Sequence, residues 1–369
     1  MTENKTIQTY YFAGGGTGGH IYPALAVAEE IQKRQPQAKI VFFCSDRAID
    51  ARILSATDFD FIPLPAKPFG KTPIAAWQFY KTFRQSRKIV KEAIGNNKAA
   101  IMISTGGFAS APAAMAARDL GMDVFMINVD AVPGKANKLL MRLAKKVFIQ
   151  FEITKKYCGK KATLTGAPLR DAFKTQIDRN VMAETLGLSP KKKTLLITGA
   201  SAGAVNINSV IGLLLNKLDA LASEWQIIHL AGIIHYDSVR TIYKDAKIGH
   251  KIMDYCDDMP SVLAFSDLVI GRAGAMSIAE FAASQTPAIC MPYPYHSDNH
   301  QKINAAQSAK AGCCEIVDDL CDTERTARLL WPVLSEIAGS AEKLRDMQLS
   351  CEQFARPDAA ATIVDCLEP

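Results

Sequence analysis

Three glycine-rich segments constrain the fold of this chain more than any other feature. GGGTGGH lies at 14–20, STGGFASAP at 104–112 and TGASAGAVN at 198–206, and each directly follows a short apolar run. Helical patterns follow the first and the third segment, so that a strand, a tight turn and a helix succeed one another. Such βαβ units build parallel sheets. The sequence therefore predicts an α/β fold.

The strand pattern occurs in two successive halves of the 369-residue chain. The segment GAPLRD, residues 166–171, separates them because Pro168 interrupts regular structure. A length of roughly 100–200 residues per domain also indicates two domains. We expect two Rossmann-like, doubly wound parallel-sheet domains that face one another across a cleft, over residues 1–165 and 166–351. The expected strands are 9–13, 40–44, 100–104, 124–128, 147–151, 194–198, 225–230, 268–270 and 288–291, and the first helix pattern starts at residue 23.

The glycine-rich turns have the chemistry of phosphate sites. Glycines let the backbone approach a phosphate, and a helix N-terminus adds N–H groups and partial positive charge. Gly14, Gly16 and Gly19 also satisfy the dinucleotide fingerprint G-x-G-x-x-G, and Asp46 supplies its acidic residue. Taken alone, this turn indicates a nicotinamide-dependent dehydrogenase. Three such turns over two domains indicate instead two phosphate-bearing ligands, such as a nucleotide-sugar donor and a phosphorylated acceptor.

Polar groups suited to a sugar follow two later strands. In GRAGAMSIAEFAA, residues 271–283, Glu280 lies in the first turns of a helix, where its carboxylate can accept both hydroxyls of a ribose. A solvated helix residue is the simpler interpretation of Glu280 alone. A second segment favours the ribose-binding interpretation. It is PYPYHSDNHQKINA, residues 292–305, which adds Asp298, His300, Gln301 and Asn304 after the strand 288–291. Ligands of open α/β sheets bind at this end of the strands.

Charge is distributed unevenly along the chain. Between Lys71 and Arg170 there are 18 Lys and Arg against 5 Asp and Glu, whereas the whole chain has a net charge of +6. A basic segment of this kind indicates an anionic partner, whether nucleic acid, phosphorylated substrate or anionic lipid. No apolar stretch approaches the ~20 residues of a spanning helix. The nine cysteines form no C-x-x-C pair, so neither a zinc site nor a disulfide framework is expected.

The ordered set of motifs resembles the MurG family, the UDP-N-acetylglucosamine transferases that complete the lipid-linked peptidoglycan precursor. GGGTGGHIYPALAVA, TGGFASAPAAMAA and AVPGKANKLL match its N-terminal motifs, and GASAGA, DDMPSVLAFSDLVI, GRAGAMSIAE and DNHQKINA match its C-terminal motifs in order. The resemblance covers nearly the whole chain. It implies the two-domain GT-B architecture, in which a C-terminal helix, at about 352–369, returns to the N-terminal domain. It also implies inverting transfer of GlcNAc from UDP-GlcNAc to lipid I, which makes lipid II for peptidoglycan synthesis.

The same resemblance implies roles for individual residues. His20 would lie at the reaction centre, the backbone at Cys256 would bind uracil, Glu280 the ribose, and Gln301 the sugar hydroxyls. The implied donor contacts are Thr17, Gly18, Gly19, Arg170, Ser201, Cys256, Ala275, Met276, Ser277, Ile278, Ala279, Glu280, His300 and Gln301. The implied contacts of the acceptor phosphates are Gly15, Gly16, Gly106 and Gly107.

The chain departs from the family pattern at three places, and these departures bear on the identity of the acceptor and on the rate of sugar transfer. INVD at 127–130 stands where the family has HEQN, so that the carboxylate of Asp130 replaces an amide. GASAGA has Ala200 in place of a glycine and Ala202 in place of a larger residue. HLAG at 229–232 replaces H-Q-[TS]-G, which puts Leu230 where the family has an amide.

The implied reaction is a single displacement in which the acceptor hydroxyl attacks C1 of the sugar while UDP leaves. A base must take the hydroxyl proton, and charge on the leaving diphosphate must be stabilised. Helix N-termini at the glycine turns can supply the stabilisation, so no metal or other cofactor is required. His20, with an unperturbed pKa of about 6.5, and Asp130 are the candidate bases.

Other interpretations stay open. A related GT-B transferase could act on another lipid acceptor, such as diacylglycerol or a different polyprenyl diphosphate, and the dehydrogenase is a third reading. An inactive relative could bind the membrane or division proteins through its basic half. The presence of His20, Glu280 and Gln301 argues against inactivity. Expected partners are UDP-GlcNAc, lipid I, an anionic membrane surface and cell-wall synthesis or division proteins, but no nucleic acid.

A helix over residues 74–94 would present an aromatic and basic face to a bilayer. Phe79, Phe83, Val90 and Ile94 fall on the face that packs into the N-terminal domain. The other face carries Trp77, Tyr80, Arg84, Arg87, Lys88 and Lys91. We therefore expect peripheral attachment to the cytoplasmic face of the bacterial plasma membrane. The alternative is a solvated basic face with Trp77 in the core.

Overall fold

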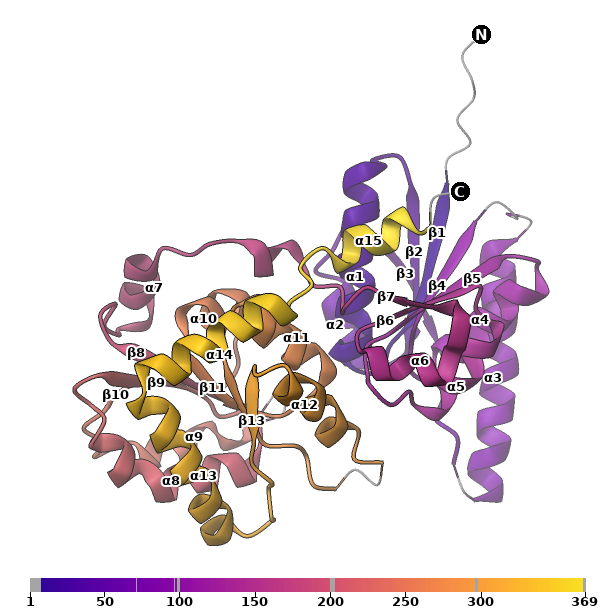
Figure 1. Ribbon diagram of the computed structural model, residues 1–369. Helices are drawn as coiled ribbons and strands as arrows, with labels where there is room; N and C mark the ends of the chain where they lie inside the picture. The colour runs from indigo at the N-terminus through magenta and orange to yellow at the C-terminus, as the bar shows by residue number, and fades with distance from the viewer. Residues whose placement is uncertain are drawn as a thin grey trace. The chain divides into compact units, whose positions relative to one another are not determined.

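The chain folds into two compact units. The computed structural model describes residues 8–70, 72–95, 97, 100–199, 203–295 and 298–367 (Figure 1). One unit comprises Met1–Arg170 and Pro357–Pro369, and the other comprises Asp171–Arg356. The division thus falls inside the GAPLRD segment, next to Pro168.

The first unit is built on a parallel sheet. In its described residues the strand order is β3-β2-β1-β4-β5-β6-β7. Every residue of β1 and β4 is buried, because helices cover both faces of a doubly wound sheet. The strands are β1 (Thr9–Gly14), β2 (Lys39–Ser45), β3 (Asp60–Leu64), β4 (Ile101–Gly106), β5 (Asp123–Asn128), β6 (Lys146–Ile149) and β7 (Ala162–Leu164). The helices are α1 (Gly18–Arg34), α2 (Ala48–Leu54), α3 (Pro73–Ile94), α4 (Ser110–Asp119), α5 (Lys135–Leu143), α6 (Lys155–Cys158) and α15 (Ala359–Asp365).

The second unit repeats this construction. Its described residues form a parallel sheet of order β10-β9-β8-β11-β12-β13. The strands are β8 (Lys193–Thr198), β9 (Trp225–Leu230), β10 (Gly249–Met253), β11 (Leu268–Gly271), β12 (Ala288–Cys290) and β13 (Cys314–Ile316). The helices are α7 (Arg179–Leu186), α8 (Val205–Asp219), α9 (Tyr236–Ile242), α10 (Met259–Phe265), α11 (Ala275–Ala283), α12 (His300–Lys310), α13 (Thr323–Gly339) and α14 (Ala341–Phe354).

Both sheets reverse their strand order at one point, between β1 and β4 in the first unit and between β8 and β11 in the second. Ligands of doubly wound sheets bind at such a reversal, outside the carboxyl ends of the strands. The first and second glycine segments follow β1 and β4. The third glycine segment and the GRAG turn follow β8 and β11. The fold therefore places all four segments at the expected ligand-binding edges.

The C-terminal segment is not the single helix predicted over 352–369. α14 ends at Phe354, and the short α15 begins at Ala359. Pro357 stands between them; it lacks the N–H of a helical hydrogen bond and disfavours a helical conformation at the preceding residue. α15 lies beside α1 (Figure 1), where the Arg34 guanidinium pairs with the Asp365 carboxylate at 2.5 Å.

Two other predictions of local structure need correction. The first helix begins at Gly18 instead of residue 23, and Pro23 lies inside it. The strands that the sequence did not predict are β3, β7, β10 and β13, which are the edge strands of the two sheets. Edge strands pair on one side only and are partly exposed, so their sequences lack the continuous apolar run of the central strands.

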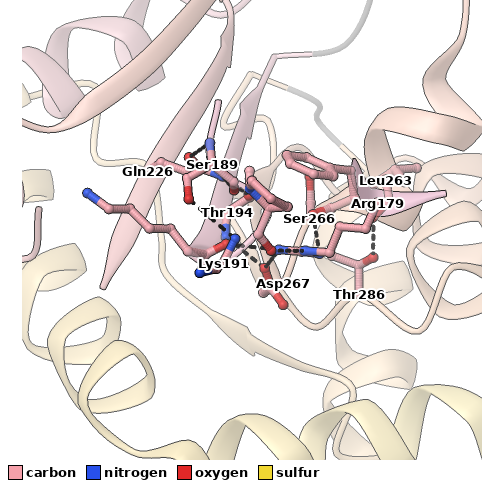
Figure 2. Close-up of polar contacts among 12 residues, drawn as sticks. Arg179, Ser189, Lys191, Thr194, Gln226, Leu263, Ser266, Asp267 and Thr286 are labelled. Carbon is pink, nitrogen blue, oxygen red and sulfur yellow. Dashed lines mark hydrogen bonds and ion pairs between the residues drawn. The ribbon is translucent and has the colours of Figure 1, made fainter. Parts of the chain in front are cut away.

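A cluster of polar side chains links the amino-terminal ends of strands in the second sheet (Figure 2). The Arg179 guanidinium donates to three backbone carbonyls and to the Asp267 carboxylate at 3.0 Å. Asp267 also accepts the Thr194 amide at 2.7 Å, at the start of β8. The cluster lies at the edge opposite the glycine segments, and its guanidinium N–H groups are directed to groups of the chain itself. We therefore assign it to the stability of the sheet.

Candidate active site

Two hydrogen bonds to Thr105 hold His20 near the start of α1. The Thr105 hydroxyl donates to the His20 carbonyl at 2.7 Å, and His20 Nδ1 lies 3.0 Å from the Thr105 carbonyl oxygen. A carbonyl only accepts, so Nδ1 carries the proton of this bond. In a neutral ring, Nε2 is then the nitrogen that can accept a proton. The bonds join the loops that follow β1 and β4.

The surroundings of His20 favour its neutral form. Burial lowers the pKa of His20 below its ordinary value. The charge of Asp130, the hydrogen bond to Thr105 and the more distant charge of Asp50 oppose this by stabilising the imidazolium. A neutral imidazole with a defined tautomer has the properties of a general base near pH 7.

The carboxylate of Asp50 lies buried beneath the first glycine-rich segment, the loop at residues 14–20, and was not predicted from the sequence. Asp50 is 0% exposed, and it accepts the Gly16 amide at 2.8 and 3.0 Å, the Ser45 amide at 3.0 Å and the Ser45 hydroxyl at 2.5 Å. Asp46, the acidic residue of the dinucleotide fingerprint, is exposed instead. The only signal for Asp50 in the sequence is its place four residues before Leu54, on the buried face of α2.

Close backbone approach explains the glycines of the first two loops. A Cβ at Gly107 would lie 2.4 Å from the Gly15 carbonyl oxygen, and a Cβ at Gly15 would lie 2.3 Å from the Asp50 carboxylate. The loops after β1 and β4 therefore touch through their backbones. Because the Gly16 amide donates to Asp50, Gly16 can offer a phosphate close approach of the backbone but not this N–H.

An amide pair supports the second glycine loop and the segment that departs from the family pattern. Asn137 Nδ2 donates to Asn128 Oδ1 at 3.0 Å, and Asn128 Nδ2 donates to the Asp130 carbonyl at 2.7 Å. A Cβ at Gly106 would lie 2.6 Å from Asn137 Oδ1. The backbone of Asp130 is thus held by the side chains of Asn128 and Thr154, and the residue is partly exposed.

The remaining predicted residues of the first unit lie on α1 and at the end of the unit. Thr17 is the N-cap residue of α1 in an extended conformation, and its side chain caps no amide. Gly18 and Gly19 form the first turn. The Arg170 guanidinium lies 4.9 Å from the centre of the Tyr22 ring, a cation–π contact inside the first unit. The predicted contact of Arg170 with a donor stays a prediction.

In the second unit, α12 presents the predicted sugar-binding side chains. Gln301 Oε1 accepts the Tyr293 amide at 2.9 Å, so the Gln301 side chain is oriented with Nε2 as its remaining donor. His300 Nδ1 lies 2.8 Å from the Asp298 carboxylate. Asn304 is buried, and its Nδ2 lies 3.5 Å from the Ala273 carbonyl oxygen, which links α12 to the GRAG turn.

α11 carries the predicted nucleotide contacts at its N-terminal end. Gly274 is the N-cap residue and has no side chain that could cap the first amides of the helix. Ala275 and Ile278 are buried, whereas Met276, Ser277, Ala279 and Glu280 are partly exposed. Cys256 is half-buried, and burial raises the pKa of its thiol. Ser201 lies outside the described residues, as do the Ala200 and Ala202 departures.

A buried ion pair holds three loops of the second unit together. Arg272 lies 2.9 Å from the Asp319 carboxylate and donates to the carbonyls of Met291 and Pro292 at 2.9 and 3.3 Å. Asp319 in turn accepts from Asn206 Nδ2 at 3.1 Å, at the start of α8. The loops after β11, β12 and β13 are thereby fixed relative to one another and to the start of α8. No sequence motif indicated this pair.

His229, in β9, is buried in its neutral form and links α8 to the residue that follows α9. Its Nδ1 lies 3.0 Å from the Tyr243 hydroxyl and its Nε2 3.1 Å from Asn208 Oδ1, and burial lowers the pKa of His229 to about 3. Asn208 Nδ2 donates to the Ala231 carbonyl at 3.0 Å. Leu230, where the family has an amide, is buried. The departure at Leu230 thus places an apolar side chain in the core.

The aromatic face of α3 is exposed, which excludes a core position for Trp77. Trp77 is 61% and Tyr80 58% exposed. Val90 and Ile94 are buried as predicted, but Phe79 and Phe83 are only half-buried and contact each other. Arg87 and Lys91 both pair with Asp119, which lowers the pKa of that carboxyl.

The same face retains other cationic and apolar groups. Arg84 lies over the Tyr80 ring, and Lys81 over Trp77. Lys88 is exposed, with the Glu92 carboxylate 3.7 Å away. Phe69 and Ile74 next to it are also exposed. Among the described residues, no helix combines the length and the apolar character that crossing a membrane requires.

An acidic D-x-D sequence lies far from the glycine loops of its sheet. It occurs at residues 58–60, and Asp58 and Asp60 are both exposed. Asp60 begins β3, so the motif stands at the amino edge of the sheet, whereas the glycine loops stand at the carboxyl edge.

Comparison with known proteins identifies the class. Residues 10–149 match the glycosyltransferase family 28 N-terminal domain, and residues 194–363 match the glycosyltransferase family 28 C-terminal domain. With two parallel sheets of Rossmann order, the fold is of the GT-B class. The chain belongs to glycosyltransferase family 28 and is a glycosyltransferase.

Full-length relatives carry one specific name. Proteins of Desulfitobacterium hafniense (strain Y51) and Geobacter metallireducens are each 33% identical to this chain. The alignments cover 96% of the chain and 97% and 96% of these relatives. Both are named UDP-N-acetylglucosamine--N-acetylmuramyl-(pentapeptide) pyrophosphoryl-undecaprenol N-acetylglucosamine transferase. The predicted membership of the MurG family is confirmed.

Solved structures share the fold. The crystal structure of Acinetobacter baumannii MurG superposes with a TM-score of 0.74 at 23% identity, over 98% of this chain and 99% of that one. A UDP-GlcNAc 2-epimerase from Neisseria meningitidis, solved with UDP-GlcNAc bound, gives a TM-score of 0.68 at 15% identity, over 98% and 99%. At these identities the likeness concerns the fold.

Proposed function

We propose that this chain transfers GlcNAc from UDP-GlcNAc to lipid I, undecaprenyl-pyrophosphoryl-MurNAc-pentapeptide, with inversion at C1. The names of the full-length relatives supply the substrates. The observation that carries the chemistry is His20, whose Nδ1 is bound to the Thr105 carbonyl, so that Nε2 is the basic nitrogen. The product is lipid II, for peptidoglycan synthesis.

In the proposed reaction His20 Nε2 takes the proton of the acceptor hydroxyl as its oxygen attacks C1. The bond between C1 and the UDP oxygen breaks, and UDP leaves with the electron pair. Proton transfer by a positioned base contributes typically 10²–10⁴-fold to such a step. The charge that Asp130 contributes near His20 stabilises the imidazolium formed. The reaction needs no further reactant.

The second unit would bind the donor. The amides at the start of α11, from Ala275 to Ser277, would hold the diphosphate together with Ser201, because a helix N-terminus attracts anions and the Ile278 amide already donates to the Gly274 carbonyl. Glu280 would accept the ribose hydroxyls, and the backbone at Cys256 would bind uracil. Gln301, oriented by Tyr293, would donate to the sugar hydroxyls, with His300 beside it.

The first unit would bind the acceptor. Gly15, Gly16, Gly106 and Gly107 would allow the acceptor diphosphate close approach to the two touching loops. Because the Gly16 amide donates to Asp50, phosphate N–H contacts would come from other amides, among them those of Thr17, Gly18 and Gly19 at the start of α1. Arg170 would contact the donor from the end of the unit.

The test is a transfer assay with the purified protein, UDP-GlcNAc and lipid I, scored for the disaccharide product. We expect lipid II and UDP in equal amounts. Parallel reactions with diacylglycerol and with a different polyprenyl diphosphate acceptor test the acceptor. Transfer to one of these but not to lipid I would overturn the proposed acceptor. Tight NAD binding by calorimetry, without UDP-GlcNAc binding, would overturn the proposed donor.

We further propose that the α3 face attaches the protein to the cytoplasmic surface of the plasma membrane. Exposed Trp77 and Tyr80 with Phe69 and Ile74 provide apolar contact, and Arg84 provides positive charge. Each basic residue near an anionic bilayer contributes about 1 kcal/mol. Since Asp119 pairs with two further cations of this face, we expect a weaker dependence on salt than the sequence alone indicates.

Liposome co-sedimentation tests this attachment. Binding should require anionic lipid, weaken as salt rises, and fall in a Trp77→Ala, Arg84→Glu, Lys88→Glu variant. The matched control is Lys217→Glu, which reverses a charge on α8 in the second unit. Sedimentation of the triple variant at the wild-type level would exclude the α3 face as the membrane contact.

A further inference from the structure

The buried carboxylate of Asp50 neither takes nor releases a proton in the proposed reaction, although its charge adds to the groups that raise the pKa of His20, and it contacts the first glycine-rich segment. Its two oxygens accept the Gly16 amide and both polar groups of Ser45, at 2.5 to 3.0 Å. These donors supply hydrogen bonds to a carboxylate that has no contact with solvent. Burying a carboxylate costs free energy unless hydrogen bonds replace those that it makes to water. The arrangement of the donors around Asp50 is therefore the feature that needs an explanation.

Gly16 is held at both of its polar groups by one short segment. Its amide donates to Asp50, and its carbonyl accepts from Arg47 at 2.9 Å. The Arg47 guanidinium also lies 5.0 Å from the centre of the Phe108 ring, in the second glycine loop. The segment after β2 therefore fixes a loop that follows β1 and touches a loop that follows β4.

The fixed loop leads directly to His20. Gly16 has a φ of +91°, and a Cβ on it would lie 2.8 Å from Phe108. Gly15 touches Gly107, and a Cβ on Gly107 would lie 3.2 Å from the His20 ring. A shift at Gly16 would thus be transmitted both along the chain and across the loop contact to His20.

We propose that Asp50 is a positioning residue: it fixes the first glycine loop at Gly16 and, through that loop, the place of His20 relative to the second loop. This rests on the proposed function. Asp50 supplies no positive charge, and its carboxylate disfavours an anion at the Gly16 amide. Its effect is therefore on orientation and not on phosphate binding.

The shape of the site requires a carboxylate at position 50. The Gly16 amide, the Ser45 amide and the Ser45 hydroxyl all donate to Asp50 Oδ2, and the Gly16 amide also lies 3.0 Å from Oδ1. An asparagine that keeps its oxygen in the place of Oδ2 would direct its buried NH₂ group at the Gly16 amide, so that two N–H donors face each other without an acceptor. Asp50→Asn therefore loosens Gly16 with little change of volume.

The test compares Asp50→Asn with Asp46→Asn, which removes the same charge from the exposed start of the same segment. We expect kcat to fall on the order of 10- to 100-fold in Asp50→Asn, as misplacement of a catalytic group by about 1 Å does. The second unit would bind UDP-GlcNAc, so the dissociation constant for UDP-GlcNAc should stay within about twofold of the wild-type value, because distant sites usually act independently. Asp46→Asn should behave as the wild type.

A second measurement keeps the proposal testable without turnover. Hydrogen exchange of the segment 14–20 should become faster in Asp50→Asn and stay unchanged in Asp46→Asn. If the wild type makes no lipid II, the proposed reaction fails, and exchange alone decides whether Asp50 holds the loop. A wild-type rate together with wild-type exchange in Asp50→Asn would overturn the inference.

Arg47→Lys is the alternative test variant if Asp50→Asn does not fold. The lysine keeps a positive charge but loses the planar group that binds the Gly16 carbonyl and lies over Phe108. We expect a several-fold lower kcat, roughly 3- to 10-fold by the usual effect of one hydrogen bond, with unchanged affinity for UDP-GlcNAc. An unchanged kcat in this variant would count against fixation of the loop through Gly16.

Discussion

The two sheets have the same strand order over six strands, but the two units hold the loops at their carboxyl edges through different groups. In the first unit Gly16 is held through its amide, which donates to the Asp50 carboxylate, as well as through its carbonyl, which accepts from Arg47. In the second unit the guanidinium of Arg272 donates to the Met291 and Pro292 carbonyls, and Asp319 balances its charge. A loop fixed through a carbonyl keeps its N–H groups for an anion, whereas a loop fixed through an N–H does not.

This difference agrees with separate roles for the two units, in which the second binds the donor and the first binds the acceptor and carries the base. The second unit combines the Arg272-bound carbonyls with an α11 N-terminus that begins at Gly274, an arrangement suited to the diphosphate of a donor. The first unit combines a negatively charged support with a neutral base at His20. We therefore expect variants of the first unit to change turnover and variants of the second to change stability or donor affinity.

The largest expected effect is that of His20→Ala on turnover. Loss of a general base typically costs 10²–10⁴-fold, and we expect a fall of kcat in that range with little change in UDP-GlcNAc affinity. Steady-state kinetics with lipid I and calorimetry with UDP-GlcNAc measure the two quantities. His235→Ala, in the second unit, is the control. Near wild-type turnover of His20→Ala would reduce His20 to a structural role at Thr105.

The next effect is expected on stability, in the second unit. Arg272→Met leaves the Asp319 carboxylate buried without its cation, which costs about 3–5 kcal/mol of unfolding free energy. The matched control is Arg328→Ala, because Arg328 pairs with Glu324 on the surface, with both side chains more than three-quarters exposed, and such pairs contribute about 0–1 kcal/mol. Urea unfolding measures both. Equal effects of the two variants would refute the special role of the buried pair.

The sequence predicted the central strands, the glycine turns and the family because these features are local. Buried strands appear as continuous apolar runs, and glycines are needed where backbones touch, as at Gly15 and Gly107. Edge strands such as β3 escaped prediction because half-exposed strands carry mixed residues. The helix break near 355–358 has a local signal in Pro357, whereas the start of α1 before Pro23 depends on tertiary packing.

The supporting residues could not be predicted for a related reason. Asp50 and Asp319 bind groups far away in the sequence, and an isolated aspartate resembles any surface carboxylate. Sequence spacing indicated Asp46 as the important acid of the first βαβ unit, but Asp46 is exposed and Asp50 binds the loop. The exposure of Trp77 likewise follows from how α3 is packed.

Glu280→Ala should have a smaller effect, on donor affinity. Hydrogen bonds to a charged group contribute about 1.5–3 kcal/mol, which corresponds to roughly 10- to 100-fold in the dissociation constant. Calorimetry with UDP-GlcNAc measures this, and Glu352→Ala on the exposed face of α14 is the control. If Glu280→Ala lowered kcat at unchanged affinity, the separation of roles between the units would fail at this residue.

The smallest expected effect is a shift of the pH profile in Asp130→Asn. The negative charge of Asp130 raises the pKa of His20 against the lowering by burial. The base is active when neutral, so the rate falls as pH falls through the pKa of His20. Removal of the Asp130 charge lowers that pKa further, and the acidic limb of the profile should move to lower pH.

The backbone at residue 130 should survive this change, because the side chains of Asn128 and Thr154 both donate to the Asp130 carbonyl. Asp123→Asn, an exposed partner of Lys145, controls for loss of a charge in the first unit. The measurement is kcat against pH for the wild type and both variants. If Asp130→Asn instead abolishes turnover at every pH while His20→Ala retains it, Asp130 is the base, and the neutral His20 only supports the loop.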